Sequence, residues 1–267
     1  MRLGCFGKIE QIEDIEQAGF QCAELDICEI VSLSDMAFEK LKVQVKKKNL
    51  KFDVFSGLLP LNIRICEKEF DTAYWLRHIE KGAQRISELG AELVPFGAGK
   101  CRSIPDDVSE EKYRSYYNQL LEFIRKICDV LSAYKIQLVI EPLGKSNSNF
   151  LNFIREADVF CRQVKRKNCA IMCDFRHMVS NGESPDEIKA YRENIKHAHI
   201  DYPLGNKRRF PRREDGCDYL PYLRALVQSG YMGRLTVEAT DYEEFAKETM
   251  ESAGYLRELL CKAHMEI

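Results

Sequence analysis

Eight short β-type runs, separated by longer amphipathic stretches, constrain the fold of this chain more than any other feature. The runs cover residues 2–6, 22–27, 50–55, 91–96, 136–141, 169–174, 195–200 and 234–238. Their apolar stretches of about four to six residues are typical of strands that are buried on both faces of a parallel sheet. Because a helix-like segment follows each run, the sequence predicts eight consecutive βα units.

The segments between the runs carry helical patterns. Apolar residues recur at helical intervals through 113–131 and form one stripe, as expected for a helix that packs on a core. Asp107, Ser184 and Asp241 precede helical segments and are predicted to cap their N-termini.

Eight βα units predict the α/β class, with one (β/α)8 TIM barrel domain spanning residues 1–267. The length agrees, since such barrels usually take about 250 residues. A doubly wound open sheet is the alternative, but no run is followed by a GxGxxG or Walker-type loop. No linker or shift in composition divides the chain.

Charge and cysteine content restrict the class of partner. The chain has 40 Lys and Arg against 42 Asp and Glu, which disfavours a general nucleic-acid binder.

No stretch approaches the roughly 18 apolar residues of a membrane span, and the N-terminus does not resemble a signal peptide. Eleven scattered cysteines without a CxxC motif indicate a reduced, cytoplasmic protein. The oligomeric state stays open, a homo-oligomer included.

Four consecutive strands are predicted to present ligand-type side chains at one rim. The active site of such a barrel lies at the C-terminal ends of its strands. The fifth, sixth and eighth runs end in Glu141, Asp174 and Glu238, and the seventh carries His197 and His199. Neighbouring strands bring these groups together, and carboxylate and imidazole ligands suit Mn, Mg, Co or Zn. We expect the deeper His197 to be a hydrogen-bonded residue of the barrel lumen.

Several motifs, in this order, resemble the sugar phosphate isomerase/epimerase family of xylose isomerase-like TIM barrels. They are FGAGKCRSIP at 96–105, IEPLG at 140–144, CDFRHM at 173–178, HAHIDYP at 197–203, RRFP at 208–211 and GYMGRLTVEA at 230–239. The resemblance covers essentially the whole chain. It implies the barrel fold and a metal-dependent isomerase or epimerase acting on a sugar or sugar phosphate.

The resemblance also implies roles for individual residues. Glu141, Asp174, His199 and Glu238 would be the four ligands of one divalent metal ion. In the same way, His177 would hydrogen-bond the substrate, and an arginine of the RRFP motif would bind substrate oxygens. The spacing favours Arg208 over Arg209. The chain departs from the family at Gly144, where many members have Asn.

Two basic residues follow the fourth run. Lys100 and Arg102 are candidates for binding a substrate phosphate or carboxylate, and a solvated basic loop is the alternative interpretation.

The ligand types explain the expected chemistry. A divalent cation on the carbonyl and hydroxyl oxygens of a hydroxyketone stabilises the enediolate that forms when a neighbouring C–H loses its proton. Glu141 and Glu238 are then the predicted base and acid. Returning the proton to the opposite face of the same carbon gives epimerisation, and returning it to the neighbouring carbon gives isomerisation.

Three other functions share parts of this pattern. A dehydratase of the inosose or dehydroshikimate type would use the same ligands and then expel a hydroxyl group. An apurinic-site endonuclease would need three zinc ions and more than the five histidines of this chain. A non-catalytic sugar-binding barrel would not require an intact ligand set.

Overall fold

All eight predicted strands form one closed, parallel barrel in sequential order. The structure is a computed structural model that describes residues 1–67 and 69–265. Each strand pairs in parallel with the next, and β1 closes the barrel against β8. The strands are β1 (Arg2–Gly7), β2 (Cys22–Asp26), β3 (Lys51–Ser56), β4 (Leu93–Phe96), β5 (Gln137–Ile140), β6 (Cys169–Asp174), β7 (Ile195–Ile200) and β8 (Arg234–Val237). The TIM barrel prediction is confirmed, and the ends of the strands lie within two residues of those predicted.

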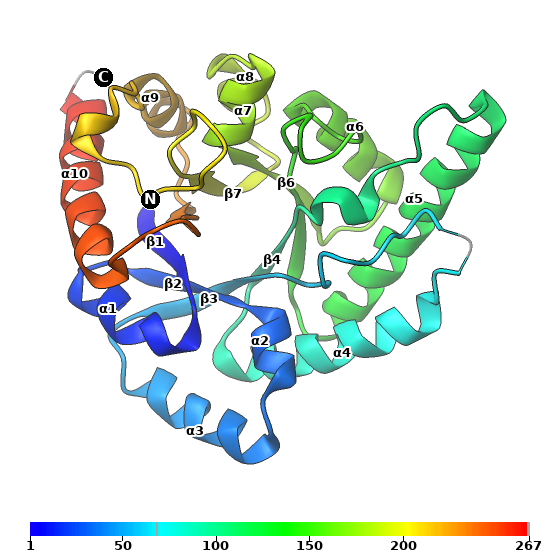
Figure 1. Ribbon diagram of the computed structural model, residues 1–267, viewed down its shortest axis with the longest axis horizontal. Helices are drawn as coiled ribbons and strands as arrows, with labels where there is room; N and C mark the ends of the chain where they lie inside the picture. The colour runs from blue at the N-terminus through cyan, green and yellow to red at the C-terminus, as the bar shows by residue number, and fades with distance from the viewer. Residues whose placement is uncertain (68, 266–267) are drawn as a thin grey trace.

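The helices form a ring around the barrel (Figure 1). They are α1 (Ile12–Gln17), α2 (Ile27–Ser32), α3 (Asp35–Lys46), α4 (Thr72–Leu89), α5 (Glu110–Ala133), α6 (Ile154–Val164), α7 (Phe175–Asn181), α8 (Asp186–Ala190), α9 (Leu220–Gln228) and α10 (Phe245–Met265). Three 3-10 turns, η1 (Ile9–Gln11), η2 (Gly99–Arg102) and η3 (Arg213–Asp215), lie in the connections. The stripe predicted over 113–131 falls within α5, whose apolar side buries seven residues.

All three predicted helix caps differ from those observed, Asp107 and Ser184 as follows and Asp241 as described with the site below. Ser109 caps α5 in place of Asp107, which adopts a left-handed φ of 54° and cannot lead directly into the helix. The helix after Ser184 begins one residue later than predicted, with Pro185 at the cap position. The Ser184 hydroxyl still accepts a hydrogen bond from the backbone N–H of Asp186, at 3.2 Å.

The barrel lumen changes from apolar to polar around its circumference. Alternate residues of a strand face opposite sides, so register partners on neighbouring strands point the same way. Glu24 of β2 pairs with Val54, and Met172 of β6 pairs with His197. Val54 and Met172 belong to a small buried cluster that is separate from the larger core between the strands and the helices. The lumen is therefore polar near β2 and β7 and apolar near β3 and β6, where Met172 lies two residues before Asp174.

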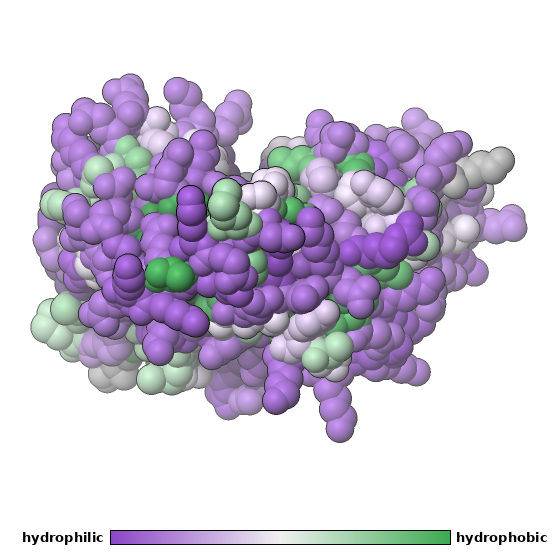
Figure 2. Space-filling model, turned by 90° about the horizontal axis from the view of Figure 1, so that it is seen from below, coloured by the Kyte–Doolittle hydropathy of each residue, from purple (hydrophilic) through white to green (hydrophobic). Residues whose placement is uncertain are grey.

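The outer surface is mostly hydrophilic. On the face shown in Figure 2, hydrophobic residues occur as isolated spots among hydrophilic ones. Among the described residues, no helix combines the length and the apolar character needed to span a bilayer. All eleven cysteines are free thiols.

Candidate metal and substrate site

The four predicted ligands meet at the C-terminal rim of the barrel. Asp174 ends β6 and is the register partner of His199 on β7. Glu141 and Glu238 directly follow β5 and β8, and their backbone N–H groups still bond to the neighbouring strands. One ligand atom from each of the four side chains lies within 4.8 Å of the others. The fold therefore brings together residues that are far apart in the sequence.

His199 is the centre of this group. Its Nδ1 atom lies 3.0 Å from Oε2 of Glu238, 3.7 Å from Oε1 of Glu141 and 4.0 Å from Oδ2 of Asp174. Nδ1 and Oε1 of Glu141 are buried and have no hydrogen-bond partner among the described residues, whereas Oε2 of Glu238 forms an ion pair with Arg208. Buried polar atoms normally have such partners, so these convergent atoms could hold a cation between them. The donor set of oxygen and imidazole nitrogen suits a divalent ion.

The position of Asp174 follows from its place at the junction of β6 and α7. Its Oδ1 atom caps α7 by accepting the backbone N–H of His177, at 3.1 Å. This bond leaves Oδ2 directed at the cluster. Burial alone would raise the pKa of Asp174, but His177, Arg208 and His199 outweigh burial and hold it below the ordinary value. Asp174 is therefore an anion in the folded protein.

His177 enters the same space from the first turn of α7. Its Nε2 atom lies 3.7 Å from Oε1 of Glu141 and 3.8 Å from Oδ2 of Asp174. Gly144 lies beside it, because a Cβ built there would come within 3.3 Å of Nδ1 of His177 and 2.7 Å of the Ser180 hydroxyl. The glycine that departs from the family pattern thus makes room for the imidazole.

Arg208 reaches into the cluster from the long loop after β7. Its Nη2 atom lies 3.0 Å from Oδ2 of Asp174, and Nη1 pairs with Glu238. Nε lies 3.3 Å from Oδ2 of the buried Asp201. Burial would raise the pKa of Glu238, but the guanidinium and His199 lower it, so this carboxylate stays ionised.

The two arginines of the RRFP motif point in different directions. Arg209 stacks its guanidinium over the ring of Tyr202, 4.1 Å from the centroid, and faces away from the ligands. The backbone N–H of Arg208 donates to Asp241, at 2.8 Å. Asp241 was expected to cap α10, which instead begins at Phe245. That prediction was wrong, because the aspartate anchors the arginine loop.

Arg102 does not line the site, contrary to the expectation that it binds substrate. Only 1% of its surface is exposed, and its guanidinium donates to the backbone carbonyls of Phe96, Glu141 and Leu151. A cation held in this way has no face left for a ligand. Arg102 instead holds the loops after β4 and β5 together beneath the rim, so its guanidinium is not available to bind a substrate.

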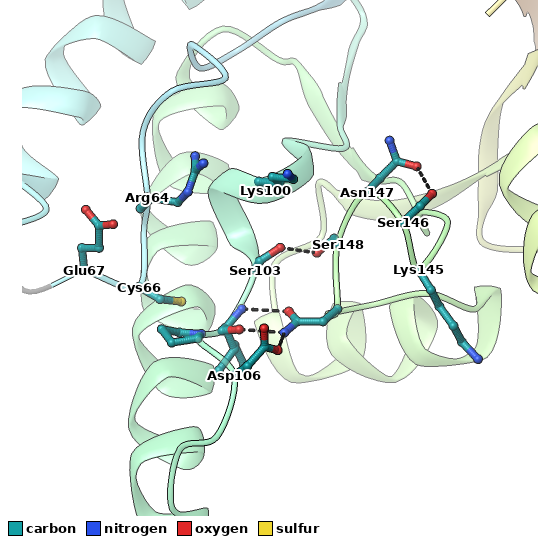
Figure 3. Close-up of a pocket in the computed structure, with 13 residues that line it drawn as sticks. Arg64, Cys66, Glu67, Lys100, Ser103, Asp106, Lys145, Ser146, Asn147 and Ser148 are labelled. Atoms are coloured by element: carbon teal, nitrogen blue, oxygen red, sulfur yellow. Dashed lines mark hydrogen bonds between the residues drawn. The ribbon is translucent and has the colours of Figure 1, made fainter. Parts of the chain in front are cut away.

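Lys100 lies on the surface in a neighbouring depression (Figure 3). This depression has a volume of about 480 Å³ and lies between the loops after β3, β4 and β5. Arg64 and Lys100 contribute cations and Glu67 and Asp106 contribute carboxylates, and the hydroxyls of Ser103 and Ser148 are 3.2 Å apart in its wall. Lys145 points away in this view, with its ammonium 5.3 Å from the ring centroid of Phe153.

A cavity of about 370 Å³ opens above the ligands, a volume within the range of small-molecule sites. Its polar lining includes Glu141, His199 and Glu238 at the ligand end together with Asp26, Ser56 and Thr240, and Phe6, Leu59, Pro60 and Phe96 are among its apolar walls. Gly97 also lines it, and a Cβ built on this residue would overlap Oε2 of Glu141. The glycine is therefore required for the observed position of the carboxylate.

Sequence reasoning missed two buried carboxylates that touch the site. Glu24 on β2 contacts His197 and His199 from below, and Asp201 supports Arg208. Burial, together with the nearby Asp174, raises the pKa of Asp201 well above its ordinary value. The one available signal was an acidic residue inside an otherwise apolar strand, at Glu24. His197 is a hydrogen-bonded lumen residue, as predicted.

A closed (β/α)8 barrel with carboxylate and imidazole groups converging at its C-terminal rim defines a class of enzyme-like barrels with a potential metal centre. The family model described as "Xylose isomerase-like TIM barrel" matches residues 12–259, and the chain belongs to this family. An uncharacterized protein of Methanocaldococcus jannaschii is 34% identical over 204 residues, which are 74% of this chain and 70% of that protein.

Sugar epimerases are among the similar solved structures. D-psicose 3-epimerase from Clostridium cellulolyticum H10, solved with D-tagatose, has a TM-score of 0.82 at 16% identity and covers 97% of this chain and 99% of its own. The 3-keto-D-glucoside 4-epimerase of E. coli has a TM-score of 0.80 at 19% identity, with the same coverage. An L-ribulose 3-epimerase has a TM-score of 0.82 at 15% identity and covers 99% and 96%. The TM-scores show a shared fold at low sequence identity.

Proposed function

We propose that this protein is a divalent-metal-dependent isomerase or epimerase of a sugar or sugar phosphate. One observation carries the proposal: two carboxylates, Glu141 and Glu238, share a buried rim cluster with His199 and Asp174, under a cavity of about 370 Å³. Two carboxylates at one reacting centre can remove a proton and return it elsewhere.

The four rim side chains would hold one Mn, Mg, Co or Zn ion, as their donor atoms and unpartnered lone pairs suggest. When bound, the ion would stabilise the negative charge that develops on substrate oxygen as the C–H bond breaks.

The protein's own residues divide the remaining tasks. Glu238 is kept ionised by Arg208 and His199, so it can accept the proton from the substrate carbon. Glu141, which directly follows β5, faces the same cluster. In its protonated form it would donate its own proton to the opposite face of that carbon, which leaves Glu141 ionised and Glu238 protonated, whereas in an isomerisation Glu238 would return the proton it took to the next carbon. His177 and Arg208 would hydrogen-bond substrate oxygens, since both reach the ligand cluster.

An anionic part of the substrate would bind in the depression beside the rim. Lys100 and Arg64 line the depression beside the rim, and both the cavity and this depression use the loops after β3 and β4. We assign Lys100 to this role, which favours a phosphorylated or acidic sugar.

The alternative functions can be distinguished by the products that they release and by the number of metal ions that they bind. A dehydratase would use the same cluster but release water. An apurinic-site endonuclease would need three ions, whereas both metal-compatible groups in the described residues use the same His199. A non-catalytic sugar-binding barrel would show binding without exchange of substrate hydrogens.

Solvent-exchange labelling tests the proposal. A panel of ketoses and their phosphates is incubated in D2O with the metal-loaded protein, and deuterium at the carbon next to the carbonyl is measured by NMR. Glu141→Gln and Glu238→Gln are compared with wild type at saturating metal, with metal content measured in parallel. Loss of exchange with metal retained supports the proton-transfer role. Product formation that is independent of both carboxylates would refute it, and a product lacking water would assign a dehydratase.

A further inference from the structure

The carboxylate of Glu24 lies on the opposite side of His199 from the proposed ligands. Its Oε1 and Oε2 atoms are 3.1 and 3.2 Å from Nε2 of His199, and Oε2 is also 3.0 Å from Nε2 of His197. Only 1% of Glu24 is exposed, and His197 is fully buried. Three strands, β2, β7 and the neighbouring β8, enclose this arrangement in the lumen.

The hydrogen bonds to the buried carboxylate of Glu24 determine which imidazole nitrogens carry protons. A buried carboxylate is tolerated only when charged or polar donors satisfy it. In the described part of the chain, the side chains that hydrogen-bond Glu24 are those of His197 and His199. Both imidazoles must therefore donate from Nε2. A proton fixed at Nε2 of His199 leaves the Nδ1 lone pair free for a cation held between Nδ1 and the carboxylates of Glu141, Asp174 and Glu238.

His197 fixes the plane of the ligand ring. The two imidazoles are arranged edge to face, with centroids 4.7 Å apart and an interplanar angle of 83°. Because both rings bond to one buried carboxylate, a rotation of either ring would break its own hydrogen bond to Glu24 and leave that carboxylate less satisfied. The lumen thus holds His199 in both tautomer and orientation, without touching the space where substrate would bind.

We propose that Glu24 is a positioning residue that keeps the proton of His199 on Nε2 and thereby presents Nδ1 to the metal. This inference rests on the proposed metal site. Carboxylates that orient a ligating histidine typically contribute 10- to 100-fold to metal affinity.

Metal titration of the apoprotein provides the first test. Mn²⁺ and Zn²⁺ binding to wild type and Glu24→Gln is measured by calorimetry and by competition with a chelating dye. We expect a 10- to 100-fold weaker affinity in the variant at equal helix content. Asp53→Asn is the matched control, because Asp53 is also a buried lumen carboxylate but pairs with Arg234, at 2.7 Å, away from the ligands. An unchanged affinity in Glu24→Gln would overturn the inference.

The ring protons provide a second test that needs neither activity nor a stable variant. In ¹H–¹⁵N NMR of ¹⁵N-histidine-labelled wild type, a slowly exchanging Nε2 proton of His199 is expected both without metal and with diamagnetic Zn²⁺. Protonation at Nδ1 alone would refute the role of Glu24. Absence of any metal binding by wild type, with the Nε2 proton present, would instead reject the proposed metal function. If Glu24→Gln does not fold, Glu24→Asp takes its place in the titration.

Discussion

Nη2 of Arg208 lies 3.0 Å from Oδ2 of Asp174, so a fixed positive charge already sits beside one of the proposed metal ligands. The same guanidinium pairs with Glu238. Arg208 consequently neutralises two carboxylates that a divalent cation would also use. A cation and this arginine must share the charge of the cluster, and the substrate oxygens that Arg208 would bind lie next to the metal position.

Removing this guanidinium is expected to separate metal binding from substrate binding. Arg208→Met should leave metal affinity equal to wild type or raise it by up to about tenfold, because a like charge near the ion is lost. The KM for the sugar should rise at least tenfold, because a charged hydrogen bond to substrate is removed. Arg209→Met is the control, since this side chain stacks on Tyr202. A large loss of metal in Arg208→Met would contradict the assignment.

Asp174→Asn should lower metal content from about one ion per chain to a small fraction. The amide keeps the cap on α7 through its oxygen, whose present partner is the backbone N–H of His177. It removes the anionic charge that the ion needs. Metal analysis after dialysis measures the effect, with Glu183→Gln as a control for loss of a buried carboxylate outside the cluster. Equal metal content in Asp174→Asn and wild type would contradict the proposed four-ligand site.

The rim ligands could be predicted because barrel topology converts strand order into spatial order. Once the runs ending at Glu141, Asp174 and Glu238 are neighbours, their last side chains must converge. The same logic placed His199 on the inner face. Hydrophobic periodicity and the residues at the ends of strands are local features, so they can be identified from the sequence alone.

The supporting residues could not be predicted, because their roles depend on contacts between distant segments. Arg102 was expected at the surface of a basic loop but is buried against three backbone carbonyls. Asp241 was expected to begin a helix but binds the backbone of Arg208. Glu24 contacts His199 across the lumen. The two residues are far apart in the sequence, so no local pattern predicts this contact.

Gly97→Ala should impair catalysis while leaving the fold intact. The new methyl group would overlap Oε2 of Glu141 and force this carboxylate to move. Since a shift of about 1 Å in a catalytic group can cost about 100-fold, kcat/KM should fall by one to two orders of magnitude. Gly254→Ala in α10 is the control, because a Cβ there meets no atom within 4 Å. Full activity in Gly97→Ala would mean that Glu141 does not need its present position.

The stability of the protein should depend on pH through Glu183. Burial raises the pKa of this carboxyl group from 4.5 to about 7. Between these values the folded state binds the proton more tightly than the unfolded chain, so the free energy of unfolding falls as pH rises from 4.5 to 7. Glu183→Gln stays neutral and should gain about 1–2 kcal/mol over wild type by pH 8, allowing for partial solvent access.

Thermal unfolding of wild type and Glu183→Gln at pH 5, 6, 7 and 8 measures this dependence. The melting temperatures should diverge as pH increases, with the variant higher. Glu193→Gln serves as the control, because the Glu193 side chain is 86% exposed and makes no buried contact. A constant difference between Glu183→Gln and wild type across the series would show that Glu183 does not titrate in this range.

Lys100 should discriminate between charged and neutral substrates. Its ammonium lies beside the rim in the depression that Arg64 and Ser103 also line, where a phosphate or carboxylate would find donors. Lys100→Met should raise the KM for a phosphorylated ketose by about 10- to 100-fold, the effect expected for losing a charge-assisted hydrogen bond, and leave the KM for the neutral ketose unchanged. Lys46→Met, at the end of α3, is the control for removing a surface charge. Steady-state kinetics on the paired sugars measures the ratio, and equal effects on both substrates would show that Lys100 belongs to a solvated loop.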